Sequence, residues 1–271
     1  MEDTEVQNLH QRNRRAWNVV AAVYENEVER DVADLRANRI CLFDYEVRLL
    51  GELRGSCRRA IALQCSHGLD ALSLWKLGAT EVIGVDGSGR MLDLARRKSQ
   101  LLGAPARWIE CDVLEVPSEL NTSADLVYTG KGSLPWVADL DRWAGVVARV
   151  LRPGGRLLLT EGHLLDWVWE PDASAFRVDQ RSGGYFADQP VENRDFPRSA
   201  FIRLRTPTDH TAGPVEHQWT TAQIVNALIG VGLVLDRLEE HAQPFWNKFP
   251  SMPPGTCEAL PHVLVILAHR A

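Results

Sequence analysis

The sequence predicts an α/β fold in which a mostly parallel sheet is flanked by helices. Three observations carry this prediction: short apolar runs alternate with segments of helical periodicity, a glycine-containing turn follows the first run, and an acidic residue ends the second. Residues 61–63 and 81–85 are the two apolar runs, and residues 69–77 carry apolar side chains at helical spacing before Gly78. Strand, helix and strand in this order form a βαβ unit, which builds parallel sheets.

The residues before this unit, 1–55, are predicted to be helical. Their apolar side chains form two stripes, which we expect to pack onto the core. The stripes contain Trp17, Val20, Val23 and Tyr24, and then Leu35, Ile40, Phe43, Val47 and Leu50.

The turn at residues 64–68 indicates the kind of ligand that the unit binds. Asp86 lies about 20 residues beyond it, the spacing at which a carboxylate accepts hydrogen bonds from ribose hydroxyls. A dinucleotide-binding turn has the pattern G-x-G-x-x-G, but Gln64 and Ser66 replace its first two glycines and only Gly68 remains. This favours a smaller, phosphate-free ligand such as S-adenosylmethionine (SAM). In a purely structural interpretation, Gln64 and Ser66 only cap the following helix.

Further strands continue the alternation beyond the βαβ unit. The predicted elements are strands at residues 107–112, 124–130 and 156–160 and a helix at residues 143–151. The segment at residues 152–155, Arg-Pro-Gly-Gly, is expected to end this helix and turn the chain. Asp112 ends the third strand, where a carboxylate is suited to bonding an adenine amino group.

The pattern breaks down between residues 162 and 216, which are rich in proline, glycine and aromatic side chains. We interpret this stretch as an inserted substrate-binding cap, because aromatic residues argue against disorder. Regular structure resumes at Thr220, which caps a helix ended by Gly230 and Gly232. Strands at residues 233–238 and 262–268 bring the total to seven.

These segments together resemble the class I SAM-dependent methyltransferases over residues 57–161. Residues 64–68 match the SAM-binding turn, Asp86 the ribose-binding acid and Asp112 the adenine-contacting acid, while residues 151–155 match the L-x-P-G-G segment. The chain is most similar to a branch with an L-Q-C-x-x-G turn. It departs from the common pattern at Ala62, where many members have an acid, and at Gln64 and Ser66.

The resemblance implies a Rossmann-like fold whose seven-stranded sheet ends in an antiparallel hairpin at its edge. The chain would be one domain: N-terminal helices at residues 1–55, a SAM-binding half at 57–161, the cap at 162–216 and a C-terminal part at 217–271. SAM would be the cofactor and S-adenosylhomocysteine (SAH) the product. The residues expected to bind it are Tyr24 (on an N-terminal helix that covers the pocket), Gln64, Cys65, Ser66, Gly68, Asp86, Gly87, Ser88, Met91, Cys111, Asp112, Val113, Thr129 and Gly130.

The acceptor of the methyl group is expected beyond the carboxyl ends of the fourth and fifth strands, where open α/β sheets bind ligands. His163 is the candidate general base, since its unperturbed pKa near 6.5 suits proton removal at neutral pH. It could equally hydrogen-bond within the cap, and Glu161 could orient His163 or hold the fold. Nine tryptophans favour an apolar or aromatic pocket. Its expected lining residues are Trp136 (which a core position would explain equally well), Tyr185, His217, Trp219 and Trp246.

The expected reaction is transfer of a methyl group to oxygen or nitrogen of a small organic molecule, in specialised metabolism. Because the sulfonium is already activated, the protein mainly supplies proximity and alignment. A missing catalytic motif therefore does not count against this function.

Composition excludes several other functions. A net charge of −6 disfavours a nucleic-acid partner, and no apolar run reaches the roughly 18 residues that span a bilayer. The N-terminal residues have acids and no apolar core, unlike a secretory signal. Five cysteines without a C-x-x-C pair indicate reduced thiols in a cytoplasmic protein. No spacing resembles a metal site.

Three other functions remain open to test. An NAD(P)-dependent oxidoreductase shares the βαβ unit but needs the missing glycines. A SAM-fold protein repurposed as a ligand sensor or non-methylating catalyst is compatible with the departures at Ala62, Gln64 and Ser66. An RNA methyltransferase is disfavoured by the acidic charge, whereas a protein substrate is compatible with the sequence.

Overall fold

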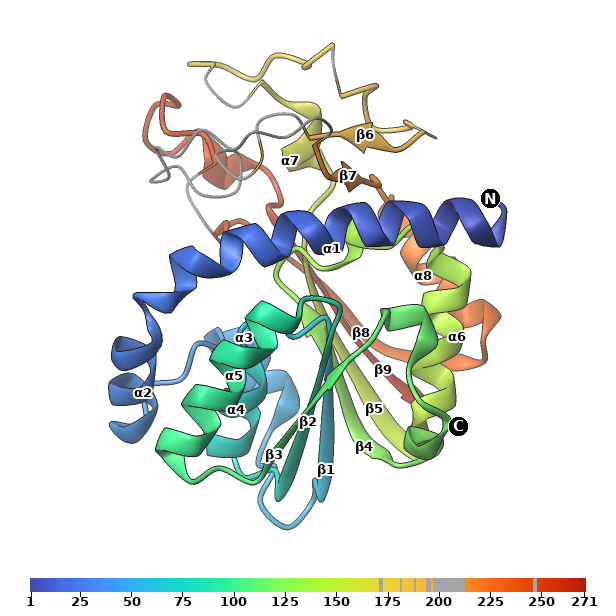
Figure 1. The fold of residues 1–271 in the computed structure, drawn as a ribbon. Coiled ribbons are helices and arrows are strands. Elements are labelled where there is room, and N and C mark those ends of the chain that lie inside the picture. Colours follow the sequence, from blue (N-terminus) through green and yellow to red (C-terminus); the bar gives the residue numbers. More distant parts are fainter. Residues whose placement is uncertain (171–172, 181, 188, 194–195, 197–212, 246–247) are drawn as a thin grey trace.

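The computed structural model describes residues 1–271 except 171–172, 181, 188, 194–195, 197–212 and 246–247. Figure 1 shows a central sheet with helices on both faces. The sheet has seven strands in the order β3-β2-β1-β4-β5-β9-β8, and the two-stranded ladder of β6 and β7 lies apart from it. The strands are β1 Arg59–Leu63, β2 Glu81–Asp86, β3 Ala106–Glu110, β4 Ala124–Gly130, β5 Leu151–Gly162, β6 Val191–Glu192, β7 Val215–Glu216, β8 Leu233–His241 and β9 Val263–Arg270.

Strands β1 to β5 are parallel, and β9 runs antiparallel to both β5 and β8. The predicted seven-stranded sheet with an antiparallel hairpin at its edge is therefore confirmed.

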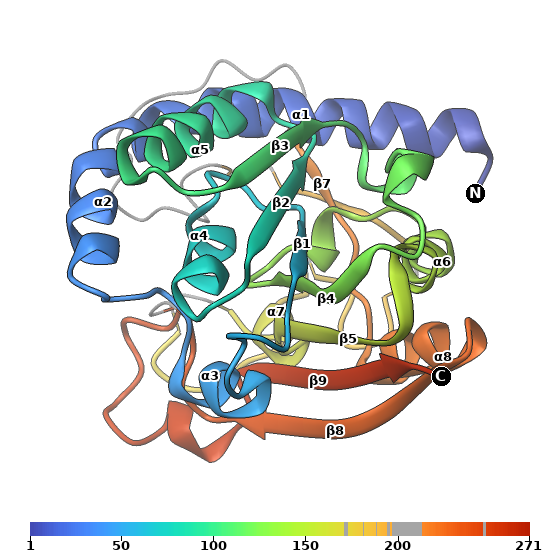
Figure 2. The ribbon, with the colours of Figure 1, turned by 90° about the horizontal axis from the view of Figure 1, so that it is seen from below.

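Helices cover both faces of this sheet, as the view from below shows (Figure 2). They are α1 Asp3–Glu25, α2 Val28–Arg36, α3 Asp44–Leu50, α4 Leu69–Lys76, α5 Gly89–Leu102, α6 Leu140–Val150, α7 Leu165–Val168 and α8 Thr221–Gly230. The alternation of side chains along β1 divides the core, since Ile61 and Leu63 pack with α6 and α8 while Ala60 packs with α3 and α4.

Several boundaries differ from those predicted, each for a local reason. Helix α6 begins at Leu140 because the side chain of Asp139 accepts a hydrogen bond from the backbone of Arg142. Helix α5 was not predicted; Ser88 caps its start and Gly103 ends it with φ 63°. The segment expected to turn the chain at residues 152–155 is an irregularity within β5, since Ala124 pairs with Leu151 and Leu126 with Arg156.

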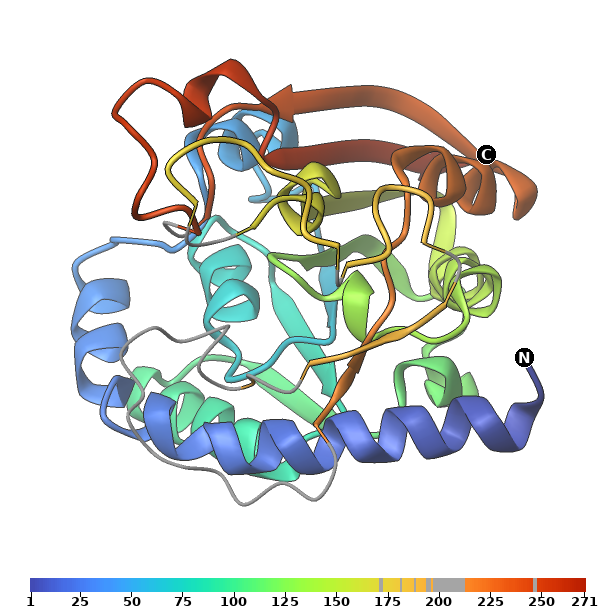
Figure 3. The same cartoon turned by 90° about the horizontal axis from the view of Figure 1, so that it is seen from above.

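Helix α1 lies across the carboxyl edge of the sheet, as Figure 3 shows from above. The side chain of Asn13 fixes it there by donating to the carbonyl of Val215 (2.8 Å) and accepting from the Val215 amide (2.7 Å). These bonds join α1 to β7, which belongs to the segment predicted as a cap.

In the described part of the chain, none of the helices is both long and apolar enough to cross a membrane. The same residues contain no cluster of His, Cys, Asp and Glu that could hold a metal ion. All five cysteines are described and have free thiols.

Candidate cofactor and acceptor site

The turn between β1 and α4 has the backbone of a glycine-rich turn although two glycines are replaced. Gln64 has φ 52°, Ser66 has φ 49° and Gly68 has φ 77°. A left-handed conformation costs about 1–2 kcal/mol at a residue with a Cβ atom. Strain of this kind persists where the surrounding structure enforces it, often at ligand sites.

Asp86, at the end of β2, braces this turn. One carboxylate oxygen accepts a hydrogen bond from the amide of Ser66 (2.7 Å) and the other from the amide of Ser88 (2.8 Å). Burial raises the pKa of Asp86 above its usual value, and the two amides oppose that shift. Since a carboxylate oxygen has two lone pairs, both oxygens can still accept from ribose hydroxyls.

Gln64 has a polar atom without a partner. Its side-chain amide nitrogen donates to the carbonyl of Ser133 (2.8 Å), but its Oε1 atom is buried and accepts no hydrogen bond from a described residue. An unpaired buried acceptor costs about 1–3 kcal/mol, so a ligand that donates to it would be stabilised. The ammonium group of SAM is such a donor.

Trp108, a residue of β3 that the sequence analysis missed, packs against two glycines of the unit. A Cβ atom on Gly68 would lie 2.5 Å from this indole, and one on Gly84 would lie 2.3 Å from it. The indole nitrogen donates to Ser99 Oγ (3.0 Å). A glycine at position 68 is therefore required both by its backbone conformation and by its contact with Trp108.

The predicted adenine-contacting acid, Asp112, is held by α1. His10 Nε2 accepts from the amide of Ala138 (2.9 Å), so His10 Nδ1 carries the hydrogen that it donates to Asp112 Oδ2 (2.7 Å). The other oxygen accepts from the amide of Leu114 (2.9 Å). Burial alone would raise the pKa of Asp112, but the hydrogen bond from His10 lowers it. An adenine contact at Asp112 stays a prediction.

The other cofactor candidates line the same edge. The ring of Tyr24 stacks on His67 of the turn at 4.2 Å between centroids. Met91 is buried in α5, and its sulfur lies 3.8 Å from Ser66 Oγ. The amide of Cys111 donates to the carbonyl of Asp86 (3.1 Å). The structure thus brings these candidates together at the carboxyl ends of β1, β2 and β3: Gln64, Cys65, Ser66, Gly68, Asp86, Gly87, Ser88, Met91, Cys111, Asp112 and Val113.

Glu161, one of the two catalytic candidates, holds the loop after β4. Its carboxylate accepts from the amides of Gly132 (2.9 Å), Ser133 (2.8 Å) and Leu134 (2.9 Å), and from the Ser133 hydroxyl (2.6 Å). Thr129 Oγ1 also bonds the Ser133 hydroxyl (2.8 Å), and Gly130 precedes the loop. Of the two roles considered for Glu161, this geometry favours holding the fold.

His163, the candidate base, has partners at both ring nitrogens. Nδ1 accepts from the amide of Leu165 (3.2 Å), so Nε2 donates to Glu240 (3.0 Å). His163 is buried and lines neither of the two cavities found at this edge. This geometry favours a hydrogen-bonding role in the cap, and a role as base stays a prediction.

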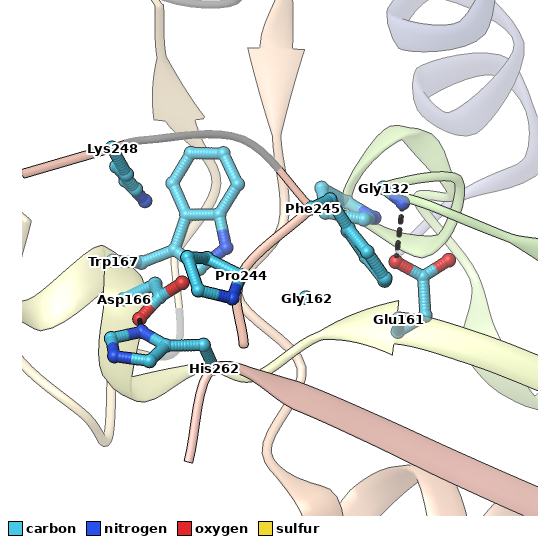
Figure 4. A pocket seen from close by; sticks show the side chains of 10 residues that line it. Gly132, Glu161, Gly162, Asp166, Trp167, Pro244, Phe245, Lys248 and His262 are labelled. Carbon is cyan, nitrogen blue, oxygen red and sulfur yellow. Dashed lines mark hydrogen bonds and ion pairs between the residues drawn. The ribbon is translucent and has the colours of Figure 1, made fainter. Parts of the chain in front are cut away.

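Two adjoining cavities lie beyond the ends of β4 and β5. They share Pro135, Glu161, Gly162 and Trp167 and are partly open, with about 360 and 270 Å³ of space that includes open solvent. The first is also lined by Asp166, Phe245, Lys248 and His262, which Figure 4 shows around it. The second is lined by His217, Gln218 and Trp219. Asp166, Lys248 and His262 were not predicted as site residues.

His217 and Trp219 therefore lie in a cavity, as expected for acceptor-binding residues. Burial lowers the pKa of His217 to about 4. Its ring stacks on Trp219 at 5.5 Å, and both ring nitrogens lack a partner among the described residues. Neutral imidazole can donate at one nitrogen and accept at the other.

The remaining acceptor candidates lie elsewhere. Trp136 packs edge-on against Trp17 (5.3 Å) and Phe196 (5.4 Å), which favours a core role. Tyr185 packs against Phe186 and lines neither cavity. Trp246 lies outside the described residues.

The chain is similar to known methyltransferases in sequence and in fold. Residues 61–155 match a family model described as a methyltransferase domain. A demethylmenaquinone methyltransferase of Thermus thermophilus is 38% identical over 81 residues, 30% of this chain and 36% of that protein. An uncharacterized 37.1 kDa protein in transposon TN4556 of Streptomyces fradiae is 38% identical over 182 residues, 64% of this chain and 50% of that protein. The chain thus spans about a third to a half of the length of these relatives.

A solved structure from Mesorhizobium loti, an S-adenosylmethionine-dependent methyltransferase, has a similar fold. The TM-score is 0.59 at 22% identity, and the match covers 88% of this chain and 98% of that chain. Likeness at this identity concerns the fold, and it confirms the fold class predicted from the sequence.

Proposed function

The chain has the class I methyltransferase fold and carries a methyltransferase domain at residues 61–155, and we propose on this basis that it transfers a methyl group from SAM to a small organic acceptor. The turn after β1 is the observation that carries the proposal. Three alternate residues of this turn, Gln64, Ser66 and Gly68, have positive φ angles. Asp86, at the end of the next strand, accepts a hydrogen bond from the turn at Ser66. The side chains of Gln64 and Ser66, where a pyrophosphate-binding turn has glycines, support a phosphate-free ligand such as SAM.

The residues around this turn could hold SAM by distinct interactions. The free lone pairs of Asp86 would accept from the ribose, and the unpaired Oε1 atom of Gln64 would accept from the ammonium group. Cys65, Met91, Cys111 and Val113 would supply apolar surface. When bound, SAM supplies a methyl group that its sulfonium has already activated.

The two cavities would then receive the acceptor. Trp167, Phe245 and Trp219 offer aromatic walls, which support an apolar or aromatic substrate. Neutral His217 would hydrogen-bond an oxygen or nitrogen of the acceptor, and this supports one of these atoms as the site of methylation. We assign the reaction to specialised metabolism. We also assign the protein to a reducing compartment, and its free thiols support this second assignment.

Calorimetric titration of the purified protein with SAH, SAM and NADH tests the cofactor. We expect micromolar binding of SAH and SAM and no heat with NADH. Tight NADH binding without SAH binding would favour the oxidoreductase alternative. SAH formation during incubation with SAM and a set of aromatic acids, phenols and amines then tests the reaction, and SAM binding without turnover on any acceptor would favour the repurposed protein.

A further inference from the structure

Lys248 has an unbalanced positive charge in the first cavity. Its Nζ atom lies 3.8 Å from the centroid of the Trp167 ring, with which it makes a cation–π contact. It makes no hydrogen bond and no ion pair within 4 Å with any residue in the described part of the chain. Burial lowers the pKa of Lys248 to about 8, which indicates that the charge is poorly solvated.

Asp166, which acts electrostatically on Lys248, does not balance this charge because it is paired with His262. His262 Nε2 lies 2.7 Å from the carbonyl of Cys257, which only accepts, so Nε2 carries a hydrogen. His262 Nδ1 lies 2.5 Å from Asp166 Oδ1, and this approach needs a proton between the two atoms. The pair therefore shares one proton and has no net charge.

The other nearby carboxylate is Glu216 of β7. Burial raises the pKa of Glu216 to about 7, and its Oε1 atom accepts a hydrogen bond from Asn193 (3.0 Å). It is therefore only about half ionised near pH 7, and it forms no ion pair with Lys248. Glu161 lines the same cavity, but four donors from the loop after β4 surround its carboxylate.

We propose that Lys248 binds an anionic group of the acceptor, a carboxylate or a phenolate, and so makes the enzyme selective for acidic aromatic substrates. This inference rests on the proposed function, because it takes the first cavity as part of the acceptor pocket. The aromatic body of the ligand would lie against Trp167 and Phe245, which face the cavity with Lys248 (Figure 4). The anion would supply the partner that the described residues do not provide.

Calorimetry with 2-naphthoate and its neutral analogue 2-naphthamide tests the proposal. The wild-type protein is expected to bind naphthoate about ten-fold more tightly than naphthamide, which corresponds to about 1.4 kcal/mol. Lys248→Met should abolish this preference, and Lys248→Arg should keep it. Lys76→Met is the matched control, since Lys76 also lies over a tryptophan ring, Trp75 at 5.4 Å, but lines neither cavity.

Dependence on pH gives a second readout. The wild-type preference should fall as pH rises through about 8, because Lys248 loses its proton, whereas Lys248→Arg should retain its preference. Asp166, His262 and Glu161 also line this cavity, and Glu216 acts electrostatically on Lys248. These groups are the same in both proteins, so the difference between the two pH profiles is assigned to Lys248 alone.

Each outcome decides the matter. Equal binding of the two probes, an equal preference in Lys248→Met, or no binding of either probe at its solubility limit would overturn the proposal. SAH is titrated separately into the same proteins. SAH binding without a naphthoate preference would overturn only the role of Lys248, while a naphthoate preference without SAH binding would overturn the proposed function and leave an anion site.

Discussion

At the scale of single residues, the turn after β1 contains side chains in a conformation that favours glycine. Ser66 has φ 49°, and a Cβ atom is strained there, whereas Gly68 at φ 77° has no room for one. Ser66→Gly removes about 1–2 kcal/mol of strain from the folded state. The added glycine also stabilises the unfolded chain by a similar amount, because it increases the chain's conformational entropy. We therefore expect the free energy of unfolding to change by less than about 1 kcal/mol.

Gly68→Ala is the contrasting substitution in the same turn. Its Cβ atom would lie 2.5 Å from Trp108 and 2.6 Å from Ala95, so it should destabilise the protein by about 3 kcal/mol. Urea unfolding of both variants measures the difference. Equal stabilities of Ser66→Gly and Gly68→Ala would contradict the described turn.

His217 gives a prediction about pH. Its pKa is lowered to about 4 from an unfolded value near 6.5, so between these pH values the unfolded state binds a proton that the native state does not bind. The stabilisation is present above pH 6.5 and is lost as pH falls toward 4. When the pH falls from 7 to 5, protonation of His217 in the unfolded state should lower the free energy of unfolding by about 2 kcal/mol.

Unfolding of wild type and His217→Phe at the two pH values checks this effect, since phenylalanine keeps a ring against Trp219. The variant should lose about 2 kcal/mol less than wild type on acidification. The same loss in both proteins would mean that His217 is not buried as described.

The residues of the cofactor turn could be predicted because sequence spacing alone places them. Gln64, Ser66, Gly68 and Asp86 belong to one βαβ unit, whose geometry is local. His10, Lys248 and His262 could not be predicted, because each comes to the site from an element distant in sequence. The cation–π contact of Lys248 with Trp167 joins residues far apart in the sequence, and no sequence motif predicts it.

At the scale of elements, α1 covers the carboxyl edge where the cofactor is proposed to bind. Asn13→Ala removes both of its hydrogen bonds with the backbone of Val215 and leaves two buried groups unpaired. We expect a loss of about 2 kcal/mol in the free energy of unfolding and faster amide exchange along α1. The exchange rates of the sheet amides should change less than those of α1.

Hydrogen exchange measured by mass spectrometry tests this prediction, with Gln11→Ala as the control on the exposed side of the same helix. Saturating SAH should restore part of the protection in Asn13→Ala, because a ligand under α1 favours the closed helix. Unchanged exchange in Asn13→Ala would contradict the docking of α1 through Asn13.

The elements were predicted unevenly. The strands of the large sheet were predicted, since buried parallel strands are short apolar runs, but the two-residue strands β6 and β7 were not. Helix α5 was not predicted, although its buried side chains recur at helical spacing and only two of them, Lys98 and Ser99, are polar. The start of α6 was misplaced because an Asp cap, rather than the first large apolar residue, determines where the helix begins.

At the scale of the whole molecule, the sheet order places the two halves of the proposed reaction at one edge. The turn of β1 and the acids after β2 and β3 lie on one side of this edge, and the cavities after β4 and β5 lie on the other. Helix α1 runs along one side of this edge (Figure 3) and contacts the loops after β2, β3 and β4. Such an arrangement would bring a sulfonium and an acceptor together away from bulk water, which is the main requirement of methyl transfer.

The most direct test of this account is the SAH affinity of the wild-type protein and of Asp86→Asn, with Asp236→Asn as a control at an exposed acid of β8. Wild type and the control should bind SAH equally, with a micromolar dissociation constant. Asp86→Asn should bind about ten-fold more weakly, because a charged acceptor for the ribose is lost, while thermal unfolding shows that it remains folded. Equal affinity in all three proteins would contradict the role of Asp86, and no SAH binding by the wild type would contradict the proposed function itself.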